Sequence, residues 1–138
     1  MTDTRSLDEI RTTIGAMPFV EAMRIEIDAA GGGAGTASMP LHRDVSFDGQ
    51  AFAGVAVATV ADIAAGAAAL AVIDREQMPF TVRVDSSMTA STLGDRLRAE
   101  ATLRERDGAR LVFDVVVRIE RSSDWLDCGT AAVTLRVP

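Results

Sequence analysis

The chain contains no lysine, one cysteine and one histidine, so arginine supplies all of its side-chain positive charge apart from that histidine. Acidic residues outnumber the arginines, and the formal net charge is −6. The arginines are scattered, which argues against nucleic acid as a main partner, because phosphate binding needs clustered basic residues. A single cysteine, Cys128, excludes a disulfide framework, as is usual in a reducing cytoplasm, and we expect it to be a small core residue.

One histidine and one cysteine are also too few for most metal sites built within one chain. We expect no metal and no other cofactor, and we expect His42 to be a solvated residue of a polar loop. The N-terminal residues MTDTRSLDEI lack the apolar core of a signal peptide, which predicts a cytoplasmic protein. With 138 residues, nearly half of them apolar, we expect a single domain covering residues 1–138.

Residues 51–73 read AFAGVAVATVADIAAGAAALAVI, a stretch of 23 residues in which Asp62 carries the only charge. A membrane span is one interpretation, because about 20 apolar residues cross a bilayer. The abundance of Ala, Gly and Thr, the central Asp and the lack of flanking positive charge argue against a span. A buried helix wrapped by a sheet explains the stretch better. An unpaired buried carboxylate is costly, so Asp62 needs a functional or structural reason.

Periodicity in the first third of the chain predicts a short helix over residues 6–15, then strands over 23–28 and 36–41. Ser6 and Glu9 have the spacing of a capping box at the start of that helix. The glycine-rich residues 31–35 predict a turn between the two strands. A phosphate-binding loop is an alternative, but the run lacks the Gly-Lys-Ser/Thr ending and a following helix.

The second half of the chain predicts four strands joined by turns, over residues 80–91, 97–106, 111–120 and 129–137. The turns are expected at residues 93–95, 107–108 and 124–127. We expect these four strands to form an antiparallel meander, one face of which the long helix covers. The predicted fold class is α+β, with an antiparallel sheet of about six strands wrapped around one long Ala-rich helix.

A series of residues near the start of the long helix stands out. It consists of Ser46, Gly49, Phe52-Ala53-Gly54-Val55 and, on the helix, Val60-Ala61-Asp62-Ile63-Ala64-Ala65-Gly66. Together with the expected architecture, this series resembles the hotdog-fold thioesterase superfamily, in its PaaI-like acyl-CoA thioesterase branch. Many members of that branch carry a loop Asn, a Gly, then His-Gly-Gly, and Leu-Ala-Asp-x-Ala-x-Gly on the helix. The resemblance covers roughly residues 17–136.

The chain departs from the family pattern at three positions. Ser46 stands in place of the loop Asn, Ala53 in place of the motif His, and Val55 in place of the second Gly. The resemblance implies that Asp62 and Gly54 are the catalytic residues. We expect a substrate site formed by Ser46, Phe52, Ala53, Val55, Gly66, Thr81, Ser86 and Ser87.

Thioester hydrolysis needs a base or nucleophile and donors for the oxyanion. Asp62 can supply the first by activating water or by direct attack. Backbone N–H groups near Gly54 can supply the second, because they are unpaired at a helix start and lie at the positive end of the helix dipole. The two residues lie eight positions apart, about 12 Å along a helix, so one carbonyl cannot reach both in one chain. We therefore predict a homodimer or a dimer of dimers with shared sites.

The expected function is an acyl-CoA thioesterase whose partner is acyl-CoA or a related thioester. The alternative is a non-catalytic hotdog module that binds an acyl-CoA or serves as a dimeric scaffold. Asp62 is alternatively a structural group satisfied by a hydroxyl such as that of Thr59, Ser86 or Ser87. Gly54 is alternatively needed only for helix-start geometry. A hydratase is disfavoured, because Ala53 offers no imidazole at the helix start.

Overall fold

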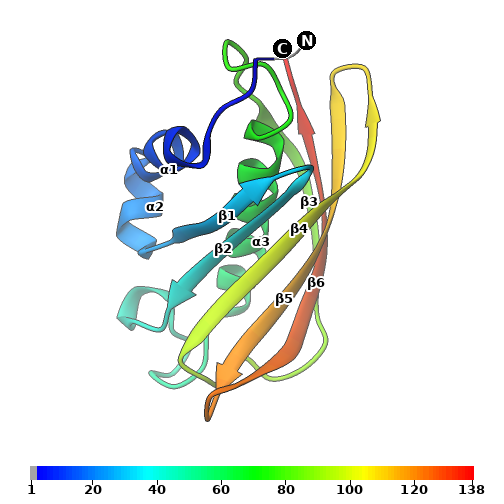
Figure 1. Cartoon of the computed structure of the whole chain (residues 1–138). Coiled ribbons are helices and arrows are strands. Elements are labelled where there is room, and N and C mark those ends of the chain that lie inside the picture. The colour runs from blue at the N-terminus through cyan, green and yellow to red at the C-terminus, as the bar shows by residue number, and fades with distance from the viewer. Residues whose placement is uncertain (1–2) are drawn as a thin grey trace.

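The computed structural model describes residues 3–138, which form one six-stranded antiparallel sheet and three α-helices (Figure 1). In chain order the elements are α1 (Leu7–Gly15), α2 (Pro18–Met23), β1 (Glu26–Gly31), β2 (Ala34–Pro40), a 3-10 turn (Arg43–Val45), α3 (Gly54–Leu70), β3 (Phe80–Met88), β4 (Arg96–Asp107), β5 (Arg110–Arg121) and β6 (Asp124–Arg136). The strand order across the sheet is β1-β2-β4-β5-β6-β3. The predicted fold class, the hotdog arrangement of a sheet around one long helix, is confirmed.

Small side chains let α3 lie close against the sheet. A Cβ placed on Gly35 of β2 would be only 2.6 Å from the carbonyl oxygen of Ala64 and 2.7 Å from the nitrogen of Ala68. Only glycine therefore fits at this crossing, and the alanines of the helix are fully buried there. Helix α3 has 17 residues, and no helix within residues 3–138 is both long and apolar enough to cross a membrane.

The N-terminal helix is confirmed together with its cap. Ser6 accepts a hydrogen bond from the backbone N–H of Glu9, whose carboxylate accepts one from the N–H of Ser6. The strand predicted to start at residue 23 is wrong at its beginning. Pro18 stands at the first position of the short helix α2, where proline costs no hydrogen bond, and β1 begins only at Glu26.

The predicted four-strand meander is also wrong in one respect, because β3 pairs with β6 at the edge of the sheet and not with β4. The connection over residues 89–95 carries the chain from that edge back to the centre. It lies against the segment that precedes α3, where the N–H of Phe52 donates to the carbonyl of Thr92 and the N–H of Gly94 donates to that of Gln50. These hydrogen bonds give the backbone of residues 89–95 partners outside the sheet. The chain can therefore pass from β3 to β4 without the two strands pairing.

Two turns differ from the sequence prediction. The β5–β6 turn is formed by Ser122 and Ser123, with φ of 52° and 68°, and residues 124–127 continue β6. Serine is not a usual residue at positive φ, which is why the sequence did not reveal this turn. The glycines 32 and 33, at φ of 61° and 82°, form the β1–β2 hairpin turn, so this run is no phosphate-binding loop followed by a helix.

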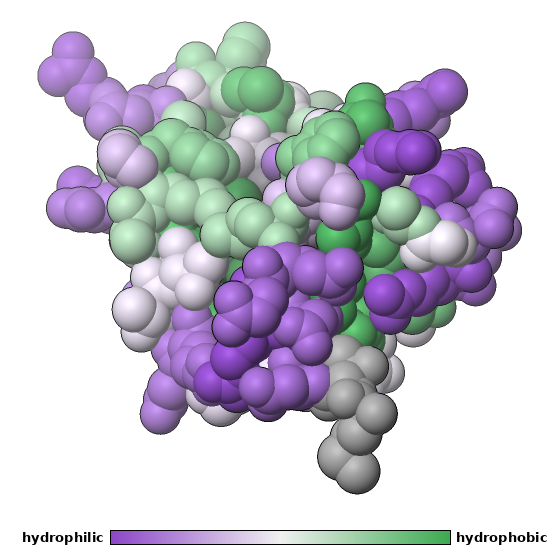
Figure 2. Space-filling model, turned by 90° about the horizontal axis from the view of Figure 1, so that it is seen from above, coloured by the Kyte–Doolittle hydropathy of each residue, from purple (hydrophilic) through white to green (hydrophobic). Residues whose placement is uncertain are grey.

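The two edges of the sheet are protected to different degrees. At β1 the guanidinium of Arg11 donates to the carbonyls of Ile27 and Asp28, at 2.9 and 3.3 Å. Every residue of β3 is exposed, and the apolar ones with large exposed side chains are Phe80, Val82, Val84 and Met88. Figure 2 views the end at which β3 begins, where hydrophobic residues occupy much of the middle with hydrophilic ones on either side. An open apolar edge of this kind favours pairing with another chain.

Candidate functional site

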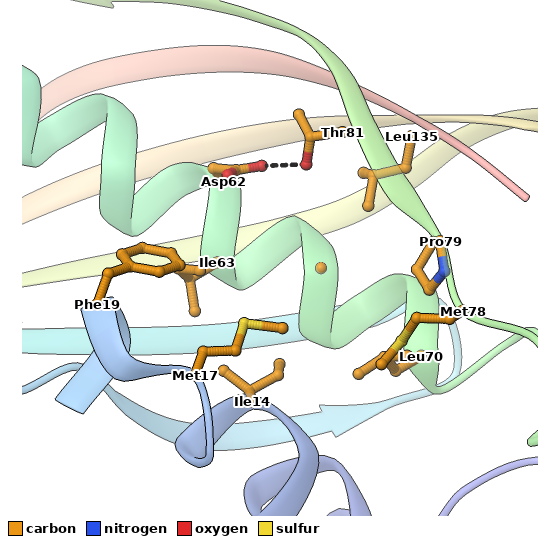
Figure 3. Close-up of a pocket in the computed structure, with 11 residues that line it drawn as sticks. Ile14, Met17, Phe19, Asp62, Ile63, Leu70, Met78, Pro79, Thr81 and Leu135 are labelled. Carbon is orange, nitrogen blue, oxygen red and sulfur yellow. Dashed lines mark hydrogen bonds between the residues drawn. The ribbon is translucent and has the colours of Figure 1, made fainter.

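Asp62 lies at mid-length on α3 and points toward the start of β3 (Figure 3). The hydroxyl of Thr81 donates a hydrogen bond of 2.7 Å to Oδ1 of Asp62. Partial burial raises the pKa of the Asp62 carboxyl above its ordinary value of 3.8, and the hydrogen bond from Thr81 opposes that rise. A desolvated carboxylate held by one donor is more basic than a surface carboxylate and keeps one oxygen free for a further partner.

An apolar cavity with a volume of about 200 Å³ opens beside Asp62 (Figure 3). Its lining residues come from α1 to α3, from the chain before β3, and from β3 and β6. They are Ile14, Met17, Phe19, Asp62, Ile63, Gly66, Leu70, Met78, Pro79, Thr81 and Leu135. Asp62 is the only ionisable side chain in this lining, so the cavity combines one carboxylate with an otherwise apolar surface.

Three of the residues predicted for the site therefore lie together: Asp62, Gly66 and Thr81. Gly66 is one helical turn after Asp62, and a Cβ built on it would meet no atom within 4 Å. The glycine thus leaves open space beside the carboxylate.

The other predicted residues of the helix start lie outside this cavity. Phe52 is buried in the core, and Ala53 is the N-cap residue of α3. Val55 is exposed on the first turn of the helix. The hydroxyl of Ser46 accepts from the N–H of Gly49 and donates to the carbonyl of Ala51, so it braces the preceding loop.

The two serines of β3 lie on opposite faces of the sheet. Ser86 is paired with Ala131, on the face that packs on α3, whereas Ser87 is paired with Thr130, on the outer face. Neither bonds Asp62. Thr59 does not bond it either, since its hydroxyl donates to the carbonyl of Val55. The hydroxyl that satisfies the carboxylate, as the structural alternative expected of a Ser or Thr, is that of Thr81 at the start of β3.

In the first turn of α3 the N–H of Ala56 donates to the carbonyl of Ala53, whereas the N–H groups of Gly54 and Val55 have no backbone partner within residues 3–138. Gly54 is the first residue of the helix and is exposed, and Ala53 has no side-chain acceptor to cap the N–H groups that follow. The accessible stripe of α3 runs from this turn to the cavity through Val55, Ala58, Thr59, Asp62 and Gly66. Gly54 and Asp62 thus share one accessible face of the helix, about 12 Å apart by helical rise.

Sequence reasoning missed the cavity walls formed by Met17, Phe19, Met78 and Pro79. A signal for them exists, because the tripeptide Met-Pro-Phe occurs twice, at residues 17–19 and 78–80. In both copies a large apolar residue next to the proline remains substantially exposed, and such residues on a surface often mark a binding site.

The remaining reactive side chains take no part in this site. Cys128 is buried, and desolvation raises the pKa of its thiol to about 11, so the thiol is protonated at neutral pH. His42 donates through Nε2 to the carbonyl of Met23 at 3.0 Å, away from the cavity. Within residues 3–138 no group of three His, Cys, Asp or Glu side chains has the arrangement of a metal site.

No family model and no curated protein sequence matches the chain. Solved structures do match its fold. A thioesterase-family protein from Silicibacter pomeroyi has a TM-score of 0.87 at 21% identity, over 94% of this chain and 96% of the other. A thioesterase mutant from Pseudomonas aeruginosa gives 0.82 at 18% identity, over 98% and 95%. A thioesterase from Haemophilus influenzae gives 0.77 at 19%, over 99% and 93%. At these identities the likeness establishes the shared hotdog fold.

Proposed function

We propose that the protein is an acyl-CoA thioesterase, which hydrolyses a thioester to a free acid and CoA. The observation that supports this most is the partly buried carboxylate of Asp62, held by Thr81 in the lining of an apolar cavity. Proteins named as thioesterases share its fold, which also supports the proposal.

In the proposed reaction the free oxygen of Asp62 takes a proton from a water molecule, and the water oxygen attacks the thioester carbonyl carbon. Backbone N–H groups near Gly54 donate to the oxyanion that develops. Collapse of the tetrahedral intermediate breaks the C–S bond, and the leaving CoA thiolate takes the proton from the Asp62 carboxyl, which restores the carboxylate. Direct attack by Asp62, followed by hydrolysis of the acyl-enzyme anhydride, is the second route open to the same residues.

Both groups serve one substrate only if they come from two subunits, since they lie about 12 Å apart on one helix. The open edge of β3 and the accessible stripe of α3 lie side by side, because Thr81 of β3 bonds Asp62 of α3. Two copies that pair through β3 would cover both surfaces and place the helices next to one another.

We therefore predict a homodimer, or a dimer of dimers, at micromolar concentration. Light scattering coupled to size-exclusion chromatography measures the mass directly, against 14.6 kDa for one chain. Replacing Val82 and Val84 by Arg on the exposed strand should shift the mass toward the monomer, because like charges would then face each other across the pair. A wild-type protein that elutes as a monomer would argue against shared sites.

The acid limb of the pH–rate profile gives a further prediction. Ionised Asp62 is the active form, so kcat/KM should fall as the pH drops through its pKa, which lies above 3.8. Thr81→Val removes the hydrogen bond that lowers this pKa, so the limb should move to higher pH. Thr81→Ser restores a hydroxyl and should return the limb toward the wild-type position. If the acid limb of the kcat/KM profile does not move in Thr81→Val, the group that titrates is not the carboxyl that Thr81 bonds.

A non-catalytic acyl-CoA-binding module is the second candidate, and the replacement of a motif His by Ala53 and of a Gly by Val55 favours it. A free-thiol assay over a panel of acyl-CoA thioesters separates the two. Release of CoA at a rate well above spontaneous hydrolysis supports the enzyme. Saturable binding with no thiol release supports the module.

A further inference from the structure

We propose, as an extension of the function above and resting on it, that the cavity beside Asp62 is an acyl subsite of fixed depth. It takes a short, uncharged acyl group and excludes long-chain and carboxylated ones. Gly66 of α3 and Phe19 of α2 determine the limit, because both line the cavity.

The size of the cavity sets the upper limit. A cavity of about 150 Å³ in a protein interior holds benzene, so about 200 Å³ accommodates a six-membered ring or a linear chain of about six to eight carbons. A chain twice as long would have to leave the cavity and expose apolar surface to water.

The chemistry of the lining decides which part of the substrate enters. Apart from Asp62 and Thr81 the lining side chains are apolar, so the two amides of a pantetheine arm would lose water there without side-chain partners. An acyl group has no such polar atoms beyond its carbonyl, which would remain at the mouth beside Asp62. A carboxylated acyl group would bring a second negative charge close to that carboxylate, which is unfavourable.

The walls are held in place by a cluster of hydrogen bonds that the catalytic groups do not use. The guanidinium of Arg5 donates to the backbone carbonyls of Asp74, Arg75 and Gln77. The guanidinium of Arg75 forms an ion pair with Glu9 at 2.8 Å. These bonds join α1 and the segment before it to the chain that leads into Met78 and Pro79, and both of these parts of the chain line the cavity. A braced cavity discriminates by length, because it cannot widen freely around a longer chain.

The test is the acyl-length profile of a matched set of variants. Gly66→Val adds an isopropyl group, whose Cβ would meet no atom within 4 Å, to the residue of α3 that lines the cavity. Gly15→Val is the control, because this residue is also a helical glycine with nothing within 4 Å of its Cβ position but does not line the cavity. Phe19→Ala shortens a side chain of the lining that comes from α2. Rates are measured for acetyl-, butyryl-, hexanoyl-, octanoyl-, dodecanoyl-, benzoyl- and succinyl-CoA. Binding of S-octyl-CoA, a thioether that cannot be hydrolysed, is measured by calorimetry.

We expect the wild-type profile to peak among the butyryl to octanoyl and benzoyl substrates, with succinyl- and dodecanoyl-CoA poor. Gly66→Val should lower the octanoyl rate relative to the acetyl rate by at least about tenfold and weaken S-octyl-CoA binding, as expected for lost pocket volume. Phe19→Ala should extend the profile to longer chains, and Gly15→Val should leave it unchanged.

An unchanged profile in Gly66→Val, or a wild-type preference for dodecanoyl- or succinyl-CoA, overturns the proposal. So does a Gly66→Val variant that alters only subunit association, which would mean that a partner subunit fills the cavity. If no thioester is hydrolysed at all, the proposed function fails, and the acyl subsite is then tested by S-octyl-CoA binding alone. Binding that Gly66→Val weakens supports the subsite. Absence of binding refutes it.

Discussion

Replacing Asp62 by Asn is expected to reduce kcat/KM by at least about 10²-fold, the usual contribution of a general base. An Asn amide has nearly the size of the carboxylate, and its oxygen can accept the hydrogen bond that Thr81 donates to Asp62. It cannot take a proton from water or attack a carbonyl carbon at a comparable rate. The loss should therefore appear in kcat rather than in KM.

The control for this variant is Thr59→Val, which changes a polar residue on the same accessible stripe of α3 but outside the cavity. Its activity should remain within a few-fold of wild type. Circular dichroism and thermal unfolding should show that Asp62→Asn stays folded, because the change removes a partly desolvated charge rather than a packing group. If Asp62→Asn keeps the wild-type kcat/KM, Asp62 has a structural role and no catalytic one.

Local chemistry made several parts of the molecule predictable. Asp62 was evident because a single charge in an apolar stretch needs a reason, and the first helix was evident from the Ser6–Glu9 spacing. The strands of the C-terminal half follow their alternating residues, and β4, β5 and β6 are antiparallel neighbours as predicted, although the β5–β6 turn was expected at residues 124–127.

The parts that sequence reasoning missed depend on contacts between distant segments. The place of β3 beside β6 is set by a crossing at residues 89–95, whose backbone pairs with the segment before α3. The cavity walls come from the N-terminal helices and from the chain before β3, about sixty residues apart in sequence, and Arg5 joins them. No local pattern encodes such a pairing, although the repeated Met-Pro-Phe marks both walls.

Gly54→Pro is the second variant with a large expected effect. Gly54 is the first residue of α3, the position at which proline is best tolerated in a helix. Ala53 before it has φ of −63° and ψ of 147°, which suits a residue preceding proline. The change should therefore remove one backbone donor while leaving the helix in place. Loss of one oxyanion donor typically lowers kcat by about 10²- to 10³-fold.

Gly54→Ala is the matched control. It keeps the N–H group and adds a Cβ that would approach Sδ of Met88 to 3.2 Å, a contact that the flexible Met88 side chain can relieve. If lost activity in the proline variant reflects the missing donor, the alanine variant should retain most of its activity. Equal losses in both would point to crowding against Met88.

Mixing Asp62→Asn with Gly54→Pro tests the central claim, that each site takes its carboxylate and its oxyanion donor from different subunits. A mixed dimer holds one site with both groups intact and one with both altered. Random reassortment makes half of the dimers mixed, so about a quarter of wild-type activity should return once subunits exchange. Exchange is verified by mass spectrometry of differently tagged copies. Activity that remains at the level of the single variants, in a sample shown to contain mixed dimers, would contradict the shared site.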